Sequence, residues 1–278
     1  DITIDFNEKT YTFNKTVGST GTTTLGLQIL KDNNVTLKNG TLTSTAVVEG
    51  KEVKMLVQNY ANLTLTDMNL VDNTAHILYA LSNNSGTVNI NGATNITTDK
   101  VAFDVCKYAS YAAPTVNVET TGIIKGAIEV TAEINNNLNI SGGLFTAQIQ
   151  EAWCAEGYIP TTTTVDGVTY NTVKEGKYVA QIGTTKYETF AAALAAVQDG
   201  EIIELFDVEG NENTEINFDR KISFTIKGQA PKYALPVVTF TNAKVNIEGS
   251  TILIPELDAR QNATINVISS TVYDAGGN

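Results

Sequence analysis

The sequence predicts an all-β protein: a right-handed parallel β-helix in two arrays, with an inserted β-hairpin and one capping α-helix. Short runs that alternate polar and apolar residues recur along the chain, such as "NVTLKNGTLTS", "ANLTLTDMNL" and "AKVNIEGSTILI". Turn signals such as "NG", "SGG" and "EG" separate these runs. One segment alone, "TFAAALAAVQDG", has the alanine-rich composition of a helix. Because alternation with period two buries one face of a strand, a series of such strands favours stacked sheets.

The first array is predicted for residues 1–150. Its strands repeat at steps of 28, 25, 28 and 22 residues if five apolar positions are taken as equivalent: Val35, Leu63, Val88, Val116 and Leu138. A repeat of this length holds two or three short strands and their turns. When such repeats stack, each strand pairs in parallel with its equivalent one turn on, and the equivalent side chains form a buried column. We therefore expect all five side chains inside the array.

The array begins with a strand, "ITIDF", that no capping element precedes. The edge of such a strand has free backbone groups, which proteins normally cover. We expect upstream residues, another domain or a neighbouring subunit to cover this edge. A homo-oligomer or a larger assembly is therefore one of the expected states of the chain.

A linker with a β-hairpin is predicted for residues 151–176. In "TTTTVDGVTYNTV", two alternating runs flank Asp166-Gly167, a pair that suits the positive φ angles of a type I′ turn. Two-residue hairpin signals of this kind are otherwise scarce in the chain. An antiparallel β-sandwich also alternates strands and turns, so it stays the alternative fold.

The second array is predicted for residues 177–278 and opens with a cap helix at about 188–199. Thr189 can cap the start of the helix through its hydroxyl, and Gly200 can take the left-handed conformation past its end. The apolar face of the helix is narrow: Phe190, Ala193, Leu194 and Val197. Since the first strand of an array exposes an apolar cross-section, we expect this helix to cover it.

The alternating runs resume after the helix at shorter steps. Four positions taken as equivalent are 20, 23 and 20 residues apart: Ile202, Ile222, Val245 and Ile265. We expect Ile202, Val245 and Ile265 to lie inside the second array.

The junction between the two predicted arrays resembles a known family. The sequence "NISGGLF" closes the first array, the hairpin follows, and "YVAQIGTTKYETFAAALAAVQDGEIIEL" opens the second. In this order the chain is similar to pectin-lyase-like β-helix proteins of gut bacteria and their phages, closely over residues 136–208 and loosely in the flanking arrays. The resemblance implies a β-helix in an extracellular setting, on a bacterial cell surface or a phage virion. It brings no catalytic motif.

Charge and composition exclude several classes of partner. The chain of 278 residues has a formal net charge of −12 and two arginines, Arg220 and Arg260. Nucleic acids and anionic membranes are bound through clusters of Lys and Arg, so neither is expected as a partner. No apolar run reaches the roughly 18 residues of a membrane-spanning helix, so membrane insertion is not expected either.

No metal site and no cofactor are predicted. One histidine, His76, and two cysteines, Cys106 and Cys154, cannot supply a zinc site of nitrogen and sulfur ligands. The cysteines are interpreted as two buried thiols, because cysteine is among the most buried residue types, and a disulfide is the alternative.

No catalytic residues are predicted, so the chain is not expected to be an enzyme. Enzymes of this fold that cleave polyuronates use acidic residues with calcium and an arginine base, or paired aspartates with a histidine. The pair Asp219–Arg220 is interpreted as a solvated ion pair at a strand boundary. His76, with Asp72 nearby, lies in the apolar run "HILYAL" and is interpreted as structural.

Four aromatic residues near predicted turns are the candidate carbohydrate-binding residues: Tyr108, Tyr111, Trp153 and Tyr158. Flat rings with a polar edge can stack on sugars. Such rings also bury large areas, so the packing of a corner or of a repeat edge is the alternative role.

Three functions of different classes remain. The favoured one is a non-catalytic structural or adhesive module, such as a fibre, decoration or spacer, whose partner is a host-surface glycan or a neighbouring virion or surface protein. A polysaccharide-degrading lyase or glycoside hydrolase is the second, because the fold hosts such enzymes but does not establish the activity. A lectin-like carbohydrate-binding domain is the third.

Overall fold

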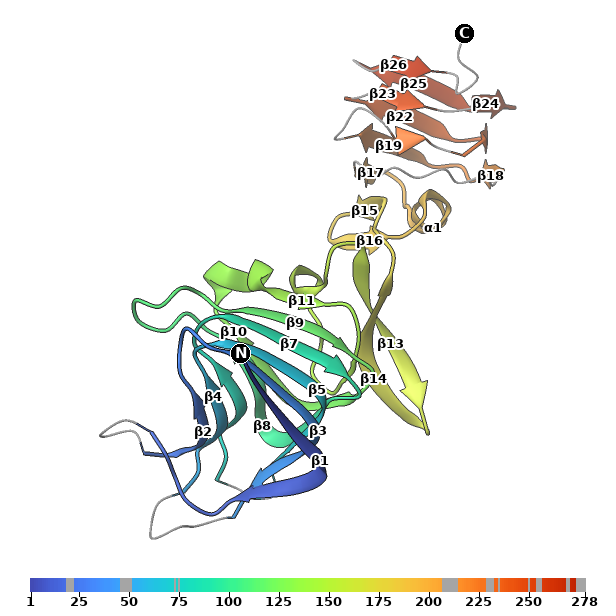
Figure 1. The fold of residues 1–278 in the computed structure, drawn as a ribbon. Helices are drawn as coiled ribbons and strands as arrows, with labels where there is room; N and C mark the ends of the chain where they lie inside the picture. Colours follow the sequence, from blue (N-terminus) through green and yellow to red (C-terminus); the bar gives the residue numbers. More distant parts are fainter. Residues whose placement is uncertain are drawn as a thin grey trace. The chain divides into compact units, whose positions relative to one another are not determined.

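The computed structural model describes residues 1–18, 23–45, 52–72, 74, 76–206, 215–228, 233–234, 236–249, 251–253, 257–268 and 271–273 (Figure 1). The chain divides into two compact units, residues 1–175 and 176–278. Both are built of β-strands, and the described residues contain one α-helix. The all-β class predicted from the alternation is confirmed.

In the first unit, most strands belong to two ladders in which each strand pairs in parallel with the strand one repeat further on. The first ladder contains β1 (Ile2–Phe13), β3 (Asn34–Ser44), β5 (Asn62–Val71), β7 (Thr87–Gly92), β9 (Thr115–Thr120) and β11 (Leu138–Ile140). The second contains β2 (Leu25–Ile29), β4 (Met55–Asn59), β6 (Tyr79–Asn83), β8 (Asn95–Val105), β10 (Ile123–Val130) and β12 (Leu144–Phe145). The ladders form one sheet, because β5 pairs with both β7 and β8.

The register of the first ladder confirms the predicted repeat. The five positions taken as equivalent are direct partners in order: Val35, Leu63, Val88, Val116 and Leu138. All five are buried. A second buried column lies two residues further along each strand: Leu37, Leu65, Ile90, Val118 and Ile140. The threonines and asparagines between the two columns are partly exposed, as the alternation of a strand requires.

The predicted hairpin and its turn type are confirmed. β13 (Tyr158–Val165) and β14 (Val168–Glu175) pair antiparallel around Asp166 and Gly167, whose φ angles are 50° and 79°. Two successive positive φ angles are those of a type I′ turn. β14 also pairs with β12, at Asn171 and Phe145, so the hairpin is part of the sheet of the first unit.

In the second unit there are three ladders, and in each of them a strand pairs in parallel with the strand one repeat further on. The first contains β17 (Ile202–Leu205), β19 (Ser223–Gly228), β22 (Lys244–Glu248) and β25 (Thr264–Ile268). The second contains β18 (Ile216–Asp219), β21 (Val238–Thr241) and β24 (Leu257–Arg260), and the third β20 (Tyr233–Ala234), β23 (Thr251–Leu253) and β26 (Thr271–Tyr273).

The predicted alignment of the second array is wrong at its first position. Ile202 is 45% exposed and pairs with Thr225, whereas its neighbour Ile203 is buried and pairs with Ile226. Two adjacent isoleucines leave the phase of the alternation ambiguous, and a slip of one residue moves a side chain to the other face.

The burial of the other predicted positions of this array agrees better with the prediction. Val245 is buried as expected, between its partners Phe224 and Ile265, and Ile265 is partly buried. Ile222 lies just before β19 and is partly buried, so it belongs to no ladder column.

The cap helix forms, but it is shorter than predicted. α1 runs over Phe190–Ala196, because Val197 has an extended ψ of 139° that ends the helix. At its start, Thr189 Oγ1 accepts a hydrogen bond from Ala192 N at 3.1 Å, as predicted. Gly200 has the predicted positive φ angle, 81°, in the turn that leads to β17.

Two elements together cover the beginning of the second unit. Phe190 and Leu194 of α1 are buried in the core of this unit, which confirms the predicted apolar face. The backbone edge of β17 is covered by a strand instead: β15 (Ala180–Ile182) pairs antiparallel with β17 and with β16 (Thr185–Tyr187). The helix therefore covers side chains, and the strand satisfies the free backbone groups.

Candidate functional site

One corner of the first unit gathers the turns that lead from the second ladder to the first. The first four of these turns comprise residues 30–33, 60–61, 84–86 and 106–114, and the fifth comprises residues 131–137. Because both ladders are in parallel register, successive turns stack on one another. Backbone hydrogen bonds of 2.9 Å join these turns to the ends of strands in the adjacent repeat: Tyr60 N to Ile29 O, Asn84 N to Asn59 O and Thr115 N to Gly86 O.

Three tyrosines meet on these stacked turns and define what we call the tyrosine corner: Tyr60, Tyr108 and Tyr111. The ring centroids of Tyr60 and Tyr111 are 5.1 Å apart, and the ring centroid of Tyr108 lies 6.2 Å from each of these two. Tilted and edge-to-face pairs at such distances attract one another. Tyr108 and Tyr111 were predicted from the sequence as candidate binding residues, whereas Tyr60 was not.

The rings of the tyrosine corner are open to a ligand to different degrees. Tyr108 is 52% exposed, and Tyr60 and Tyr111 are half-buried. Burial, and then the neighbouring phenols of Tyr108 and Tyr111, raise the pKa of Tyr60 above its ordinary value. Like the hydroxyl of any tyrosine, that of Tyr60 keeps its proton at neutral pH and can donate a hydrogen bond.

A cavity of about 460 Å³ lies beside the tyrosine corner and includes Tyr60 and Tyr111 in its lining. Small-molecule sites typically have volumes of roughly 300–1,000 Å³. The polar part of the lining comes from two of these turns and from the first residues of β3 and β5: Lys31, Asp32, Asn33, Asn34, Asn62 and Ser85. The site thus combines aromatic rings with amide and hydroxyl groups.

The asparagines of this cavity are held in defined orientations. Asn62 Nδ2 donates to Asn34 Oδ1 at 2.9 Å, and Asn34 Nδ2 donates to Asp1 Oδ1 at 2.9 Å. Asn33 Nδ2 donates to two carbonyl oxygens of its own turn, at 2.9 and 3.1 Å. An amide offers two donor hydrogens and an acceptor oxygen, so these contacts fix each side chain without using its full capacity.

The backbone at this corner is constrained as well. Gly86 has a φ of 81°, and a Cβ there would come within 2.2 Å of the carbonyl oxygen of Ala61. Ala109, between the two sequence-predicted tyrosines, has a φ of 48°. A residue with a Cβ rarely adopts this region, and such positions cluster at ligand-binding segments.

The other two predicted binding residues lie elsewhere. Trp153 is 6% exposed in the core of the first unit, and its Nε1 donates to Asn135 Oδ1 at 3.4 Å. A ring so buried has no face for a ligand. Tyr158 is half-buried at the start of β13, opposite Glu175. Among the described residues, no ring contact joins either of them to the tyrosine corner.

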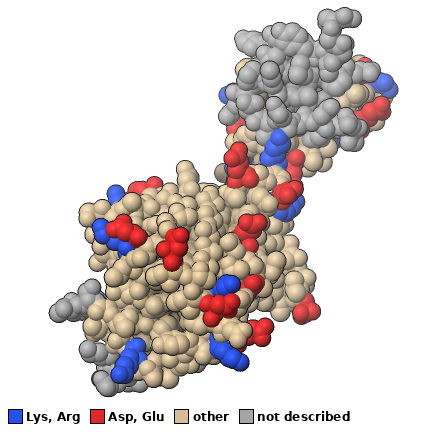
Figure 2. All heavy atoms as spheres, in the orientation of Figure 1, with Lys and Arg blue, Asp and Glu red and all other residues tan. Residues whose placement is uncertain are grey.

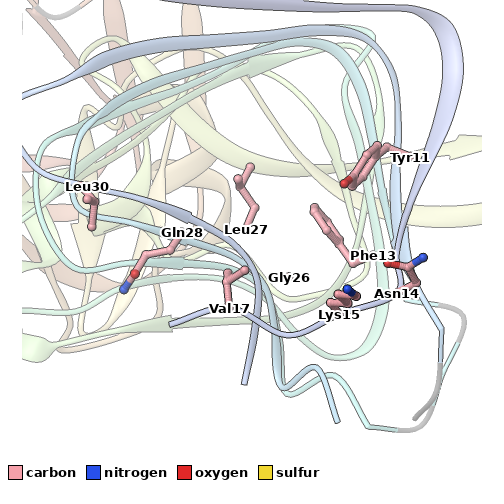
Figure 3. A pocket seen from close by; sticks show the side chains of 9 residues that line it. All are labelled: Tyr11, Phe13, Asn14, Lys15, Val17, Gly26, Leu27, Gln28 and Leu30. Carbon is pink, nitrogen blue, oxygen red and sulfur yellow. The ribbon is translucent and has the colours of Figure 1, made fainter. Parts of the chain in front are cut away.

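A second hollow, of about 470 Å³, lies beside β1 and β2 (Figure 3). Its lining is largely apolar and includes Tyr11, Phe13 and Leu27, with Lys15 as its charged residue. β1 pairs with β3, and within the described part of the chain no strand pairs with its other edge, so the cover expected for that edge stays a prediction. Because the lining includes no carboxylate and no imidazole, the hollow does not indicate catalysis.

His76 has a different partner from the one suggested by its neighbours in the sequence. Its Nδ1 lies 3.1 Å from Glu52 Oε1. Asp72 instead accepts hydrogen bonds from Thr74 N, at 2.9 Å, and Thr98 Oγ1, at 3.0 Å. His76 and Asp72 therefore do not form the acid–base pair that a polyuronate hydrolase would need.

Arg220 binds the end of the cap helix rather than its neighbour Asp219. Its Nη1 donates to Val197 O at 2.7 Å and to Ala195 O at 3.4 Å, and its Nη2 donates to Gln198 Oε1 at 3.3 Å. Asp219 Oδ1 accepts from Asn242 Nδ2 at 2.9 Å. The interpretation as a solvated Asp–Arg pair is thus corrected: the guanidinium satisfies carbonyl groups that a helix leaves unpaired at its C-terminus.

One buried carboxyl was not predicted from the sequence. Asp104 on β8 is 5% exposed, and it accepts hydrogen bonds from Ser82 Oγ, at 3.1 Å, and from Asn83 N. Burial raises the pKa of Asp104 to about 7, with a smaller contribution from the charge of Glu129, although both hydrogen bonds lower it. A carboxyl of this kind suits a general acid when it faces a cleft, but none of the cavities described above includes Asp104 in its lining.

The two cysteines are free thiols, so the alternative of a disulfide is wrong. Both are half-buried, and burial raises the pKa of Cys106 and raises that of Cys154 to about 11. Within the described ranges, no group of three or more His, Cys, Asp or Glu side chains could hold a metal ion. None of the helices in the described part of the chain has the length and apolarity needed to span a membrane.

The charged residues do not gather into one patch on the face shown in Figure 2. Lys and Arg are scattered there among Asp and Glu, and most of the described surface belongs to neither group. The described residues on that face form no basic cluster of the kind that binds polyanions.

Comparisons with protein-family models, with curated proteins and with solved structures each find no match to this chain. The geometry of the tyrosine corner and its cavity is therefore the main indication of what this chain binds.

Proposed function

We propose that both units are right-handed parallel β-helices, and that the chain is a non-catalytic module for display and adhesion on a bacterial cell surface or a phage virion. The ladders of short parallel strands and their buried columns support the β-helix. The resemblance over residues 136–208 supports the extracellular setting. A net charge of −12 suits a part that faces solvent without attracting nucleic acid.

The tyrosine corner is the observation that carries the adhesive role. Tyr60 comes from one turn, Tyr108 and Tyr111 come from another that is far along the chain, and the three rings gather beside a polar cavity. Aromatic faces pack against the apolar face of a sugar ring, and neighbouring amide and hydroxyl groups bind its hydroxyls. The partner at this site is a host-surface glycan.

Affinity electrophoresis of the whole chain in gels containing polysaccharides tests this function. We expect retardation by at least one glycan, and we expect Tyr108→Ala and Tyr111→Ala to weaken binding about tenfold, since a contact of about 1.4 kcal/mol corresponds to that factor. Tyr11→Ala is the matched control, because Tyr11 is 54% exposed, as against 52% for Tyr108, and its ring likewise packs against another aromatic ring, that of Phe13. This control should bind like the unmodified chain.

Two outcomes would reject the proposal. If the folded Tyr108→Ala and Tyr111→Ala variants bind a glycan as tightly as the control does, the binding site is not the tyrosine corner. Release of shorter sugars from any polysaccharide would instead support the second function, a polysaccharide-degrading enzyme. The thermal unfolding of each variant shows whether it has kept its fold.

A further inference from the structure

We infer that the ligand of the tyrosine corner is a neutral oligosaccharide, a chain of uncharged sugar rings, and that uronate and sialylated glycans are disfavoured. This inference rests on the proposed adhesive function and adds the chemical class of its ligand.

The charges of the cavity cancel. Lys31 and Asp32 are the charged residues of its lining, and Lys31 Nζ lies 3.6 Å from Asp32 Oδ2. A sugar carboxylate is bound well where a cation has no anionic neighbour. An anionic sugar would therefore meet a cation that already has an anionic partner.

The neutral polar groups of the cavity match the hydroxyls of a sugar. A hydroxyl both donates and accepts, and so do the amides of Asn34 and Asn62 and the hydroxyl of Ser85. Asn33, whose Nδ2 already donates to two carbonyl oxygens of its own turn, offers its Oδ1 as an acceptor. The hydrogen bonds between Asn62, Asn34 and Asp1 hold two of these amides in place before a ligand arrives. Groups that are already ordered lose little entropy on binding, which favours recognition by neutral hydrogen bonds.

The rings add a contact that does not depend on charge. Tyr108 exposes half of its surface, and Tyr111 belongs both to the ring cluster and to the lining of the cavity. One sugar can therefore lie against a tyrosine while its hydroxyls, or those of the next sugar, reach the asparagines. Binding of this kind should be nearly insensitive to salt.

The test compares dissociation constants of the whole chain for neutral polymers, a β-glucan, a mannan and a galactan, and for polygalacturonate. We expect a neutral polymer to bind at least about tenfold more tightly than polygalacturonate, with little change between low and high salt.

Asp32→Asn tests the cancellation of charge directly. The variant leaves Lys31 without its partner, so we expect affinity for polygalacturonate to rise about threefold or more, in a salt-sensitive way, while affinity for the neutral polymer stays the same. Asp32 has a φ of 65°, a region that asparagine tolerates, so the turn should keep its shape. Asp166→Asn is the matched control: it changes the net charge equally, at a residue with a φ of 50° in the hairpin turn, and should alter neither affinity.

The outcomes separate the two proposals. Tyrosine-dependent binding that prefers polygalacturonate would overturn the neutral class and leave the adhesive function standing. An Asp32→Asn variant with the same preference as Asp166→Asn would also overturn the inference. No tyrosine-dependent binding to any glycan would reject the adhesive function, and the inference with it.

Discussion

Asp104, a described residue of β8, has a carboxyl whose ionisation opposes the fold. Its carboxyl is nearly inaccessible to water, and burial raises its pKa from about 3.8 to about 7. Between these two pH values the folded state binds a proton that the unfolded state has released. Stability from this group is therefore fully present below the lower pKa and is lost as the pH rises through the higher one.

We accordingly predict that Asp104→Asn becomes more stable relative to the unmodified chain as the pH rises. Between pH 5 and pH 7.5 the difference in the free energy of unfolding should grow by on the order of 2 kcal/mol, because an amide has no charge to bury. Denaturant unfolding at several pH values measures it. Asp99→Asn is the control, since the hydrogen bond and charge of Lys125 lower the pKa of exposed Asp99. A pH-independent difference for Asp104→Asn would contradict this account.

Single residues also mark where the sequence is informative and where it is not. Val35 and its four equivalents could be predicted because alternation and repeat length agree. Ile202 could not, because the adjacent Ile203 satisfies the same pattern one residue later. Tyr60 belongs to no local motif. Its signal lies in the repeat alignment, since Tyr60 lies three residues before Leu63 and Tyr111 five residues before the equivalent Val116, so both fall in turns that precede equivalent strands.

Among the elements, the cap of the second unit combines local and distant contacts. The N-terminus of α1 follows from local sequence, because the Thr189 hydroxyl binds the backbone three residues on. Its C-terminus is completed by Arg220, a distant residue that a local pattern cannot reveal. β15 has three residues, too few for a periodic signal, so its role at the edge of β17 was not predicted.

The contribution of α1 can be measured by placing a charge on each of its faces. Leu194 is 1% exposed, so Leu194→Asp should lower the free energy of unfolding of the second unit by several kcal/mol, about the cost of an unpaired buried charge. Ala192 is exposed in the same helix, and Ala192→Asp should change stability by less than about 0.5 kcal/mol. Thermal unfolding compares the two variants. Equal stabilities would show that the helix covers nothing.

At the scale of the whole molecule, the sequence determines the fold more fully than it determines the site. Strand class, parallel register in the first unit and the hairpin follow from periodicity and turn chemistry. The site depends on which turns the register brings together, so half of it, Tyr108 and Tyr111, could be predicted and Tyr60 with the asparagine-lined cavity could not. Trp153 shows the converse, since an aromatic residue near a turn can equally lie in the core.

The most direct test of the central claim is a crystal structure of this chain with the neutral oligosaccharide that it binds best. We predict parallel stacked strands in both units, with a sugar ring against Tyr108 or Tyr111 and its hydroxyls within hydrogen-bond distance of Asn33, Asn34 or Asn62. A sugar bound in the hollow beside β1 and β2, or anywhere else away from these turns, would contradict it.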